Sequence, residues 1–166
     1  MAANPNMPQT PAGYLKTTAI IHFALIVGQS LFAVLSVFLS KKIMINVRNI
    51  HDPLLYVVPV FALSGSVLGN ILFRNKVNNI YATDTLKSKL AAYQSATIIR
   101  FALLEGPSLF AIGAFLLSGE MFYLLVSIII IGYFIYLKPT KERVENDVKL
   151  SYQELEDFNQ PDKVMY

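Results

Sequence analysis

The 166-residue sequence contains no cysteine and no tryptophan, and only 15% of its residues are charged. Without cysteine the chain has no disulfide, no thiolate metal ligand and no cysteine nucleophile, although the redox compartment stays open. Soluble globular domains carry about 25% charged residues. The shortage of charge, with 54% hydrophobic residues and a mean hydropathy of +0.48, predicts a membrane protein.

The few charges are unevenly distributed. Residues 139–166 carry a net charge of −3, whereas residues 1–138 carry +6. The pI of about 9.1 therefore reflects Lys and Arg that flank apolar runs. The sequence has no basic helix and no aromatic stacking motif of the kind that binds nucleic acid, so we expect no nucleic-acid partner.

Apolar runs of membrane length recur along the chain. A helix of 20 residues covers about 30 Å, the thickness of the hydrocarbon core. Inside lipid the backbone must satisfy its own hydrogen bonds, so such runs are expected to be helices. The sequence predicts an all-α membrane protein with four transmembrane helices, at about 18–40, 54–73, 97–118 and 121–137.

These spans divide the chain into three parts. We expect a flexible N-terminal tail over 1–16, a four-helix transmembrane domain over 17–138 and a polar, acidic cytosolic tail over 139–166. In the last part, Ser151 and Glu154 have the spacing of a capping box. Apolar residues at helical spacing predict one amphipathic helix there, either solvated or docked on a partner: Val144, Val148, Tyr152 and Leu155.

Two of the spans repeat one another. Shifted by 78 positions, residues 18–40 match residues 96–118 at 12 of 23 positions. This internal duplication predicts two tandem helical hairpins of the same orientation. The two copies differ in a few polar or special residues, where function is most expected: His22, Val27 and Gln29 correspond to Arg100, Glu105 and Pro107.

The connections between spans carry recognisable signals. Gly119-Glu120 predicts a tight antiparallel turn, and Thr83 or Asp84 is positioned to cap a helix that runs directly into the third span. The loop 41–52 is expected to lie along the membrane interface or to extend the first helix. Without tryptophan, tyrosine must supply the interfacial belt, from Tyr14, Tyr56, Tyr93, Tyr123 and Tyr136.

The basic residues near span ends indicate the orientation. Eight Lys or Arg lie on the side that holds both termini, and three lie in the 41–52 loop. By the positive-inside rule both termini are cytoplasmic, and we expect the bacterial cytoplasmic (inner) membrane.

Glu105 is the strongest candidate for an ion-binding residue. It lies about 11 Å into its span, where a charged side chain costs about 3 kcal/mol on insertion scales. The carboxyl group must therefore be protonated, paired or sheltered. It either binds a proton or cation, or serves as a neutral hydrogen-bonding residue between helices.

Other polar residues could support Glu105. Arg100 lies near the cytoplasmic interface and can extend towards it, and His22 occupies the same depth in the first repeat, on a stripe with Gln29 and Ser36. By depth, Ser66 and Asn70 can join them in one cluster. His51 lies in a loop, so no two-histidine haem or metal site is expected, and we expect no cofactor.

Small residues and prolines predict how the helices pack. Pairs four residues apart allow close backbone approach: Ala24 with Gly28, Gly65 with Gly69, and Ala102 with Gly106. Pro59 and Pro107 are expected to kink their helices, because each frees a carbonyl one turn earlier, at Leu55 and Leu103.

The stretch Ala102-Leu-Leu-Glu-Gly-Pro-Ser-Leu-Phe110 resembles the carboxylate-bearing helix of the rotary ATPase proteolipid (c subunit) family, which reads roughly A-L-x-E-x-x-A-I-Y. The resemblance covers one helix of four and implies that Glu105 binds a translocated proton or sodium ion. The chain departs from the family by lacking the close-spaced glycines of its other helix, by carrying Arg100, and by having Glu105 on the first helix of a hairpin.

The sequence favours a non-enzymatic subunit or accessory component of a larger membrane assembly, in a homo-oligomer or with other membrane subunits. The alternative is proton or cation translocation through Glu105. A weaker idea is a lipid or quinone bound near His22. An enzyme is not expected, because the spans hold too few titratable groups to supply an acid, a base and a nucleophile together.

Overall fold

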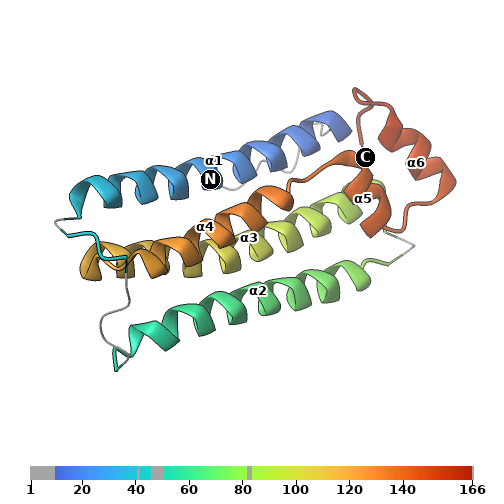
Figure 1. Ribbon diagram of the computed structural model, residues 1–166. Helices are drawn as coiled ribbons and strands as arrows, with labels where there is room; N and C mark the ends of the chain where they lie inside the picture. The colour runs from blue at the N-terminus through green and yellow to red at the C-terminus, as the bar shows by residue number, and fades with distance from the viewer. Residues whose placement is uncertain (1–9, 41, 46–50, 82–83, 166) are drawn as a thin grey trace.

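The computed structural model describes residues 10–40, 42–45, 51–81 and 84–165. Within these ranges every regular element is an α-helix. The helices are α1 (Pro11–Leu39), α2 (Leu54–Asn78), α3 (Leu86–Ser118), α4 (Met121–Tyr136), α5 (Lys141–Asp147) and α6 (Tyr152–Asn159). Figure 1 shows the four long helices running alongside one another, with α3 and α4 between α1 and α2. The predicted all-helical class is confirmed.

Three of the helices, α1, α2 and α3, are long and apolar enough to cross a membrane. With 16 residues, α4 is about 24 Å long, which is less than the hydrocarbon core. It qualifies as a span only together with α5, to which it bends by 82°. By length and composition, the described part of the chain therefore has three or four helices that can span a membrane.

The core of the bundle forms around α3, which packs against all three of the other long helices. Two apolar clusters lie along it, one around Phe115 and Tyr123 and the other around Phe101 and Phe134. The outward faces of α1 and α2 are apolar and exposed, as in Phe38 and Leu63. This arrangement suits a bundle surrounded by lipid rather than by water.

One end of the bundle carries the α3–α4 turn, and we call it the turn end. Gly119 has φ 75° and closes α3 in the left-handed conformation that favours glycine. The predicted antiparallel turn is confirmed. Met44 pairs with this turn, because its N–H donates to the Gly119 carbonyl (2.8 Å) and its carbonyl accepts from Met121 N–H (2.9 Å). The chain after Leu39 is thus extended here, not a continuation of α1, and 46–50 lie outside the described residues.

The opposite end holds α5 and α6, and we call it the capped end. There α1 begins at Pro11, inside the tail expected over 1–16, while residues 1–9 lie outside the described ones. The reason is local: the Thr10 hydroxyl accepts a hydrogen bond from Gly13 N–H (3.1 Å), and Pro11 suits the first helical position. Tyr14 is then buried.

The predicted extension of the third span is confirmed, since α3 runs unbroken from Leu86 to Ser118. Its cap is Thr85, whose hydroxyl accepts from Ser88 N–H. Of the two caps expected from the sequence, Thr83 lies outside the described residues, and Asp84 instead accepts from Tyr81 N–H.

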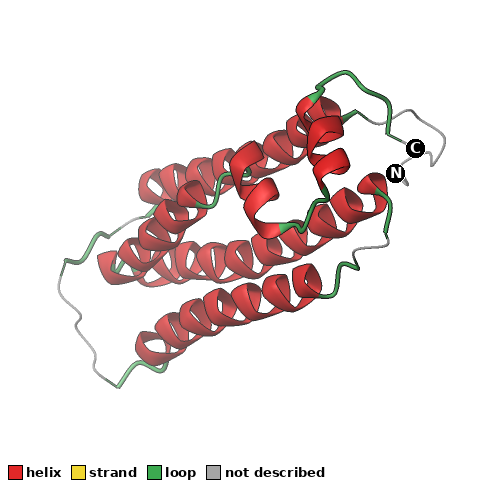
Figure 2. Cartoon of the chain, turned by 90° about the vertical axis from the view of Figure 1, so that its right-hand side faces the viewer, coloured by secondary structure: helices red, strands yellow, loops and turns green. Residues whose placement is uncertain are grey.

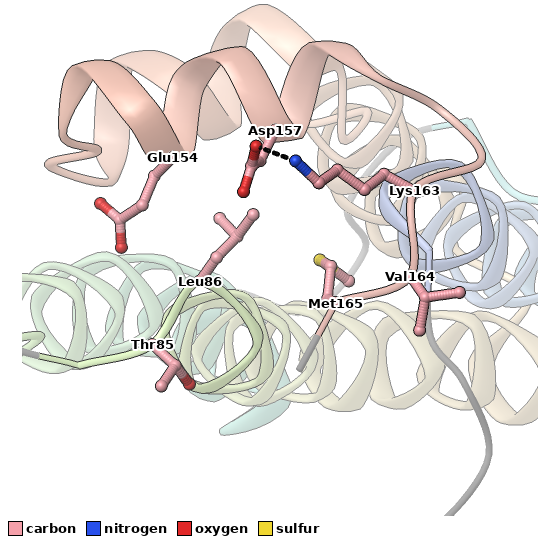
Figure 3. Close-up of a pocket in the computed structure, with 7 residues that line it drawn as sticks. All are labelled: Thr85, Leu86, Glu154, Asp157, Lys163, Val164 and Met165. Carbon is pink, nitrogen blue, oxygen red and sulfur yellow. Dashed lines mark hydrogen bonds and ion pairs between the residues drawn. The ribbon is translucent and has the colours of Figure 1, made fainter.

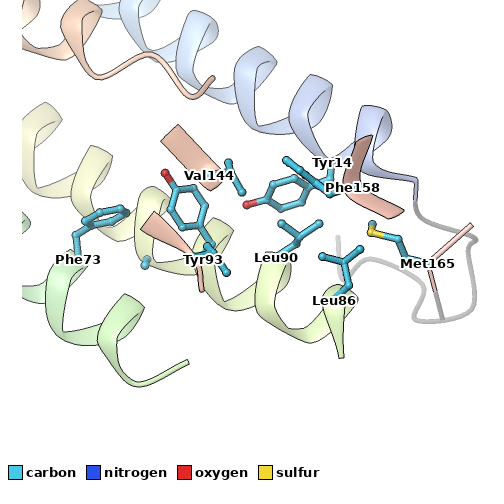
Figure 4. Packing of buried hydrophobic residues seen from close by; sticks show 10 residues of the cluster. Tyr14, Phe73, Leu86, Leu90, Tyr93, Val144, Phe158 and Met165 are labelled. Atoms are coloured by element: carbon cyan, nitrogen blue, oxygen red, sulfur yellow. The ribbon is translucent and has the colours of Figure 1, made fainter. Parts of the chain in front are cut away.

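The acidic tail forms two short helices in place of the single predicted one. Thr140 caps α5, and Ser151 caps α6 through the predicted capping box, which is confirmed. Figure 2 shows both helices across the near end of the bundle. They bury Val144 and Phe158 against side chains of α1 and α3, in the cluster drawn in Figure 4.

A buried ion pair holds this cap in place. Lys89 Nζ lies 2.8 Å from Glu154 Oε2 and 3.3 Å from the Lys149 carbonyl, and the lysine side chain is only 1% exposed. Partial burial by itself raises the pKa of Glu154, but the hydrogen bonds from Lys89 and Ser151 lower it by more, so the net shift is downward. Figure 3 shows the adjoining hollow between α6 and the start of α3, with the exposed Asp157–Lys163 pair at its edge.

Candidate functional site

Buried polar side chains line the inner face of α1. Thr18, His22, Gln29 and Ser36 are all buried, while Phe23, Leu31 and Phe38 of the same helix are exposed. The stripe of His22, Gln29 and Ser36 expected from their spacing thus faces the protein interior. Such an arrangement shelters polar groups from lipid, as hydrocarbon surroundings require.

The side chain of His22 is fixed by packing. Its Nε2 lies 2.8 Å from the Phe134 carbonyl, and its ring packs on the rings of Phe101 and Phe134, with centroid distances of 5.0 and 5.2 Å. One ring nitrogen is therefore occupied by a backbone carbonyl of α4. This contact gives His22 a structural role at the junction of α1, α3 and α4.

Asn70 and Arg100 meet through a third residue. The Asn70 amide donates to the Tyr133 hydroxyl (3.0 Å), and an Nη of Arg100 donates to the same hydroxyl (3.2 Å). The guanidinium also lies 4.9 Å from the centre of the Phe73 ring. Tyr133 thus joins α2, α3 and α4 at the depth where Arg100 enters the membrane.

The other two members of the expected cluster lie apart from this network. The Ser66 hydroxyl donates to the Ala62 carbonyl of its own helix (2.8 Å). Glu105 is half-buried and forms no hydrogen bond or ion pair with any residue that the structure describes. Five residues were expected to lie together because of their similar depth in the membrane. The structure connects two of them, Asn70 and Arg100. The other three lie apart from that pair: His22, Ser66 and Glu105.

Tyr133 is the residue that sequence reasoning missed. The sequence predicts tyrosines only as interfacial anchors, with Tyr136 in that role at the end of the fourth span. The available signal was that Tyr133 lies one helical turn before Tyr136, at the depth of a membrane arginine that needs a hydrogen-bond acceptor.

The small-residue pairs fall into two groups. A Cβ on Gly65 would lie 2.5 Å from the Leu103 carbonyl oxygen and 2.7 Å from Pro107 Cγ, so α2 approaches α3 where proline has freed that carbonyl. In contrast, nothing lies within 4 Å of a Cβ placed on Gly28 or Gly106. Their partners Ala24 and Ala102 are exposed as well. One small-residue pair, Gly65 with Gly69, packs against another helix of the same chain, and the other two pairs face outward.

A small polar layer crosses the middle of the bundle. Ser108 of α3 and Ser127 of α4 share a buried hydrogen bond of 3.0 Å. Gln29 of α1 is fully buried, and neither atom of its amide has a partner within the described part of the chain. In the same part of the chain, no group of three or more His, Asp or Glu side chains is arranged to hold a metal ion.

No family model, curated protein or solved structure matches this chain. The fold itself defines the class. Over the residues that the structure describes, the fold is all-helical, with three or four helices long and apolar enough to span a membrane, which indicates a membrane protein.

Proposed function

We propose that the chain is a non-enzymatic component of a larger membrane assembly, as a homo-oligomer or with other membrane subunits. In this proposal the four long helices are four spans in two tandem hairpins, derived by duplication. Both termini face the cytoplasm of a bacterial cell and the bundle lies in the cytoplasmic membrane. The excess of Lys and Arg at the capped end supports this orientation.

The observation that carries the proposal is the environment of Glu105. Its carboxyl group has no partner among the described residues, and the positions beside it on α3, Ala102 and Gly106, are exposed and small. A carboxylate facing acyl chains near mid-membrane costs about 3 kcal/mol on insertion scales. A helix from another chain, packed closely on Gly106, would remove Glu105 from lipid and offer it a hydrogen bond.

The corresponding pair on α1 supports the same conclusion. Ala24 and Gly28 occupy the equivalent positions in the first repeat and are also open. Because Gly65 and Gly69 are already used against α3, the chain uses this type of contact where it has a partner. The two outward pairs are therefore available for helices of other subunits.

Replacing Gly106 by leucine should abolish or strongly weaken association without unfolding the chain, because nothing lies within 4 Å of its Cβ position. The measurement is native gel mobility and co-purification in mild detergent. The matched control is Gly132→Leu on α4, whose Cβ position is equally open. A wild-type chain that is strictly monomeric and retains no neighbour, or equal effects of both substitutions, would contradict the proposal.

The alternative function is proton or cation translocation through Glu105, in the manner of the proteolipids that its helix resembles. The specific observation in its favour is that this carboxyl group has no partner in the described part of the chain, which leaves it available to bind an ion. In an oligomer, the same interface would shelter the ion-binding group and provide the pathway.

This alternative makes a chemical prediction. A hydrophobic carbodiimide should label Glu105 when the carboxyl group is protonated, and the labelling should fall as the pH rises. Mass spectrometry of the labelled peptide measures it, with Glu105→Gln as the blank. An unreactive Glu105, together with a Glu105→Gln strain that behaves as wild type, would reject translocation while leaving the assembly role intact.

A further inference from the structure

Two arginines and two tyrosines form a continuous column at the capped end, which we call the Arg–Tyr ladder: Arg100, Tyr133, Tyr136 and Arg143. Arg100 donates to the Tyr133 hydroxyl (3.2 Å), and the rings of Tyr133 and Tyr136 stack with centroids 6.4 Å apart. The Arg143 guanidinium then lies 4.8 Å from the centre of the Tyr136 ring. The ladder thus connects α3, α4 and α5.

Both guanidinium groups are held in place but not neutralised. Arg100 lies against the Phe73 ring, and Arg143 donates to the Tyr136 carbonyl (2.8 Å). Each guanidinium carries five N–H donors, of which the described residues accept from one apiece. Neither arginine has a carboxylate within 4.0 Å in the described part of the chain. Fixed, unpaired guanidinium donors match the oxygens of a phosphate group.

The acidic residues at the capped end do not neutralise the positive charge of the Arg–Tyr ladder. Asp147 accepts a hydrogen bond from Tyr93 (3.0 Å), and Glu154 pairs with Lys89. Glu142 and Glu145, on the same helix as Arg143, form no ion pair with it. Two further cations, Arg74 and Lys138, are exposed at the same end. The local field therefore favours an anion.

The depth of the ladder matches a lipid headgroup. From Arg100 to Ser118, α3 rises about 27 Å, close to the thickness of the hydrocarbon core. Arg100 therefore lies at the edge of that core, and Tyr136 and Arg143 lie farther out, where headgroups are found. One turn deeper, Ile129 on α4 and Val67 on α2 are exposed and apolar, and an acyl chain can lie along them.

We propose that the Arg–Tyr ladder binds the phosphate group of an anionic phospholipid, with the acyl chains of that lipid running along α2 and α4. Arg143 donates to the phosphate oxygens at headgroup depth, and Arg100 adds a second positive charge at the edge of the core, with the two tyrosine rings between them. Basic sites between helices at the cytoplasmic side are a recurrent way of binding such headgroups. This proposal is independent of the assembly role, because it uses neither Glu105 nor the open glycines.

The test is a lipid titration of the delipidated full-length protein in detergent, followed by its thermal unfolding midpoint. Phosphatidylglycerol should raise the midpoint of the wild-type chain, and phosphatidylcholine should not. Arg143→Gln and Arg100→Gln should each weaken the phosphatidylglycerol affinity about tenfold. Lys16→Gln is the matched control, since it removes one exposed cation from the same end on α1 and should leave the affinity unchanged.

Three results would overturn the proposal. Equal stabilisation by phosphatidylcholine would show that binding does not depend on the charge of the headgroup. Equal stabilisation by inorganic phosphate would indicate a site for soluble anions, and an equal loss in Lys16→Gln would indicate unspecific charge attraction. If Arg100→Gln does not fold, Arg143→Lys decides: it keeps the charge but loses the planar fork, so the affinity should fall several-fold, and an unchanged affinity contradicts the ladder.

Discussion

Gly65→Ala should destabilise the bundle by about 3 kcal/mol, at the upper end of the usual range for overpacking. The new Cβ would lie 2.5 Å from the Leu103 carbonyl oxygen and 2.7 Å from Pro107 Cγ. Neither a backbone oxygen nor a proline ring can rotate away, so α2 and α3 must separate along their shared contact. The measurement is reversible unfolding in mixed detergent micelles, followed by circular dichroism.

The neighbouring glycine provides the control. At Gly69 the nearest atoms to a new Cβ lie at 3.5 Å, which is ordinary contact. Gly69→Ala should therefore not lower the free energy of unfolding by more than about 0.5 kcal/mol, because alanine also favours the helix. Equal stability of the two variants would mean that α2 does not approach α3 at Gly65 as closely as described.

Glu154→Gln should release the cap formed by α5 and α6, at a cost of about 3 kcal/mol, because it leaves the buried Lys89 ammonium without a counter-charge. Hydrogen exchange of α6 and limited proteolysis of the C-terminal segment measure the loss. The control is Asp157→Asn, which removes a pair whose side chains are 37% and 45% exposed and should cost less than about 1 kcal/mol. A protected α6 in Glu154→Gln would contradict the role of the pair.

The same pair predicts a pH dependence. The pKa of Glu154 is lowered in the folded state, so its contribution is complete above the ordinary carboxyl pKa of about 4.3 and is lost as the pH falls through the lowered value. Protection of α6 should therefore decrease below about pH 4 in the wild-type chain. The variant with glutamine at this position should lack that step, since it has no carboxylate to protonate.

Features that depend on neighbouring residues in the sequence were predictable. The lengths of the apolar runs predicted the long helices. Gly119 predicted the α3–α4 turn, and Ser151 with Glu154 predicted the N-terminal cap of α6. The shared stripe of His22, Gln29 and Ser36 also followed from spacing, because one face of a helix repeats about every seven residues. Its inward direction is a finding of the structure. These signals act within one or two helical turns.

The tail shows where local periodicity fails. Val144, Val148, Tyr152 and Leu155 have the spacing of one helix, but Val148 is extended and the chain restarts at the Ser151 cap. Tyr152 is 88% exposed, whereas Val148 and Phe158 are buried against α1 and α3. The break lets both short helices reach the end of the bundle, and that surface is formed by residues far away in the sequence.

The candidate site was only partly predictable for a similar reason. Depth in the membrane follows from the residue number, so Asn70 and Arg100 could be placed at one level. The direction in which each helix faces depends on packing between helices, which decided that Tyr133 completes their network and that Glu105 stays outside it. Glu105 has no hydrogen-bond or ion-pair partner among the residues that the structure describes.

The segment after α6 supplies a hydrogen-bond acceptor to the first turn of α1. The N–H of Ala12, in the opening turn of α1, donates to the carbonyl of Pro161 (3.2 Å), and such N–H groups have no acceptor within their own helix. All of α1 therefore precedes its acceptor in the chain by more than 100 residues. A chain cut before residue 161 would lose this acceptor and leave the Ala12 N–H at the start of α1 without it.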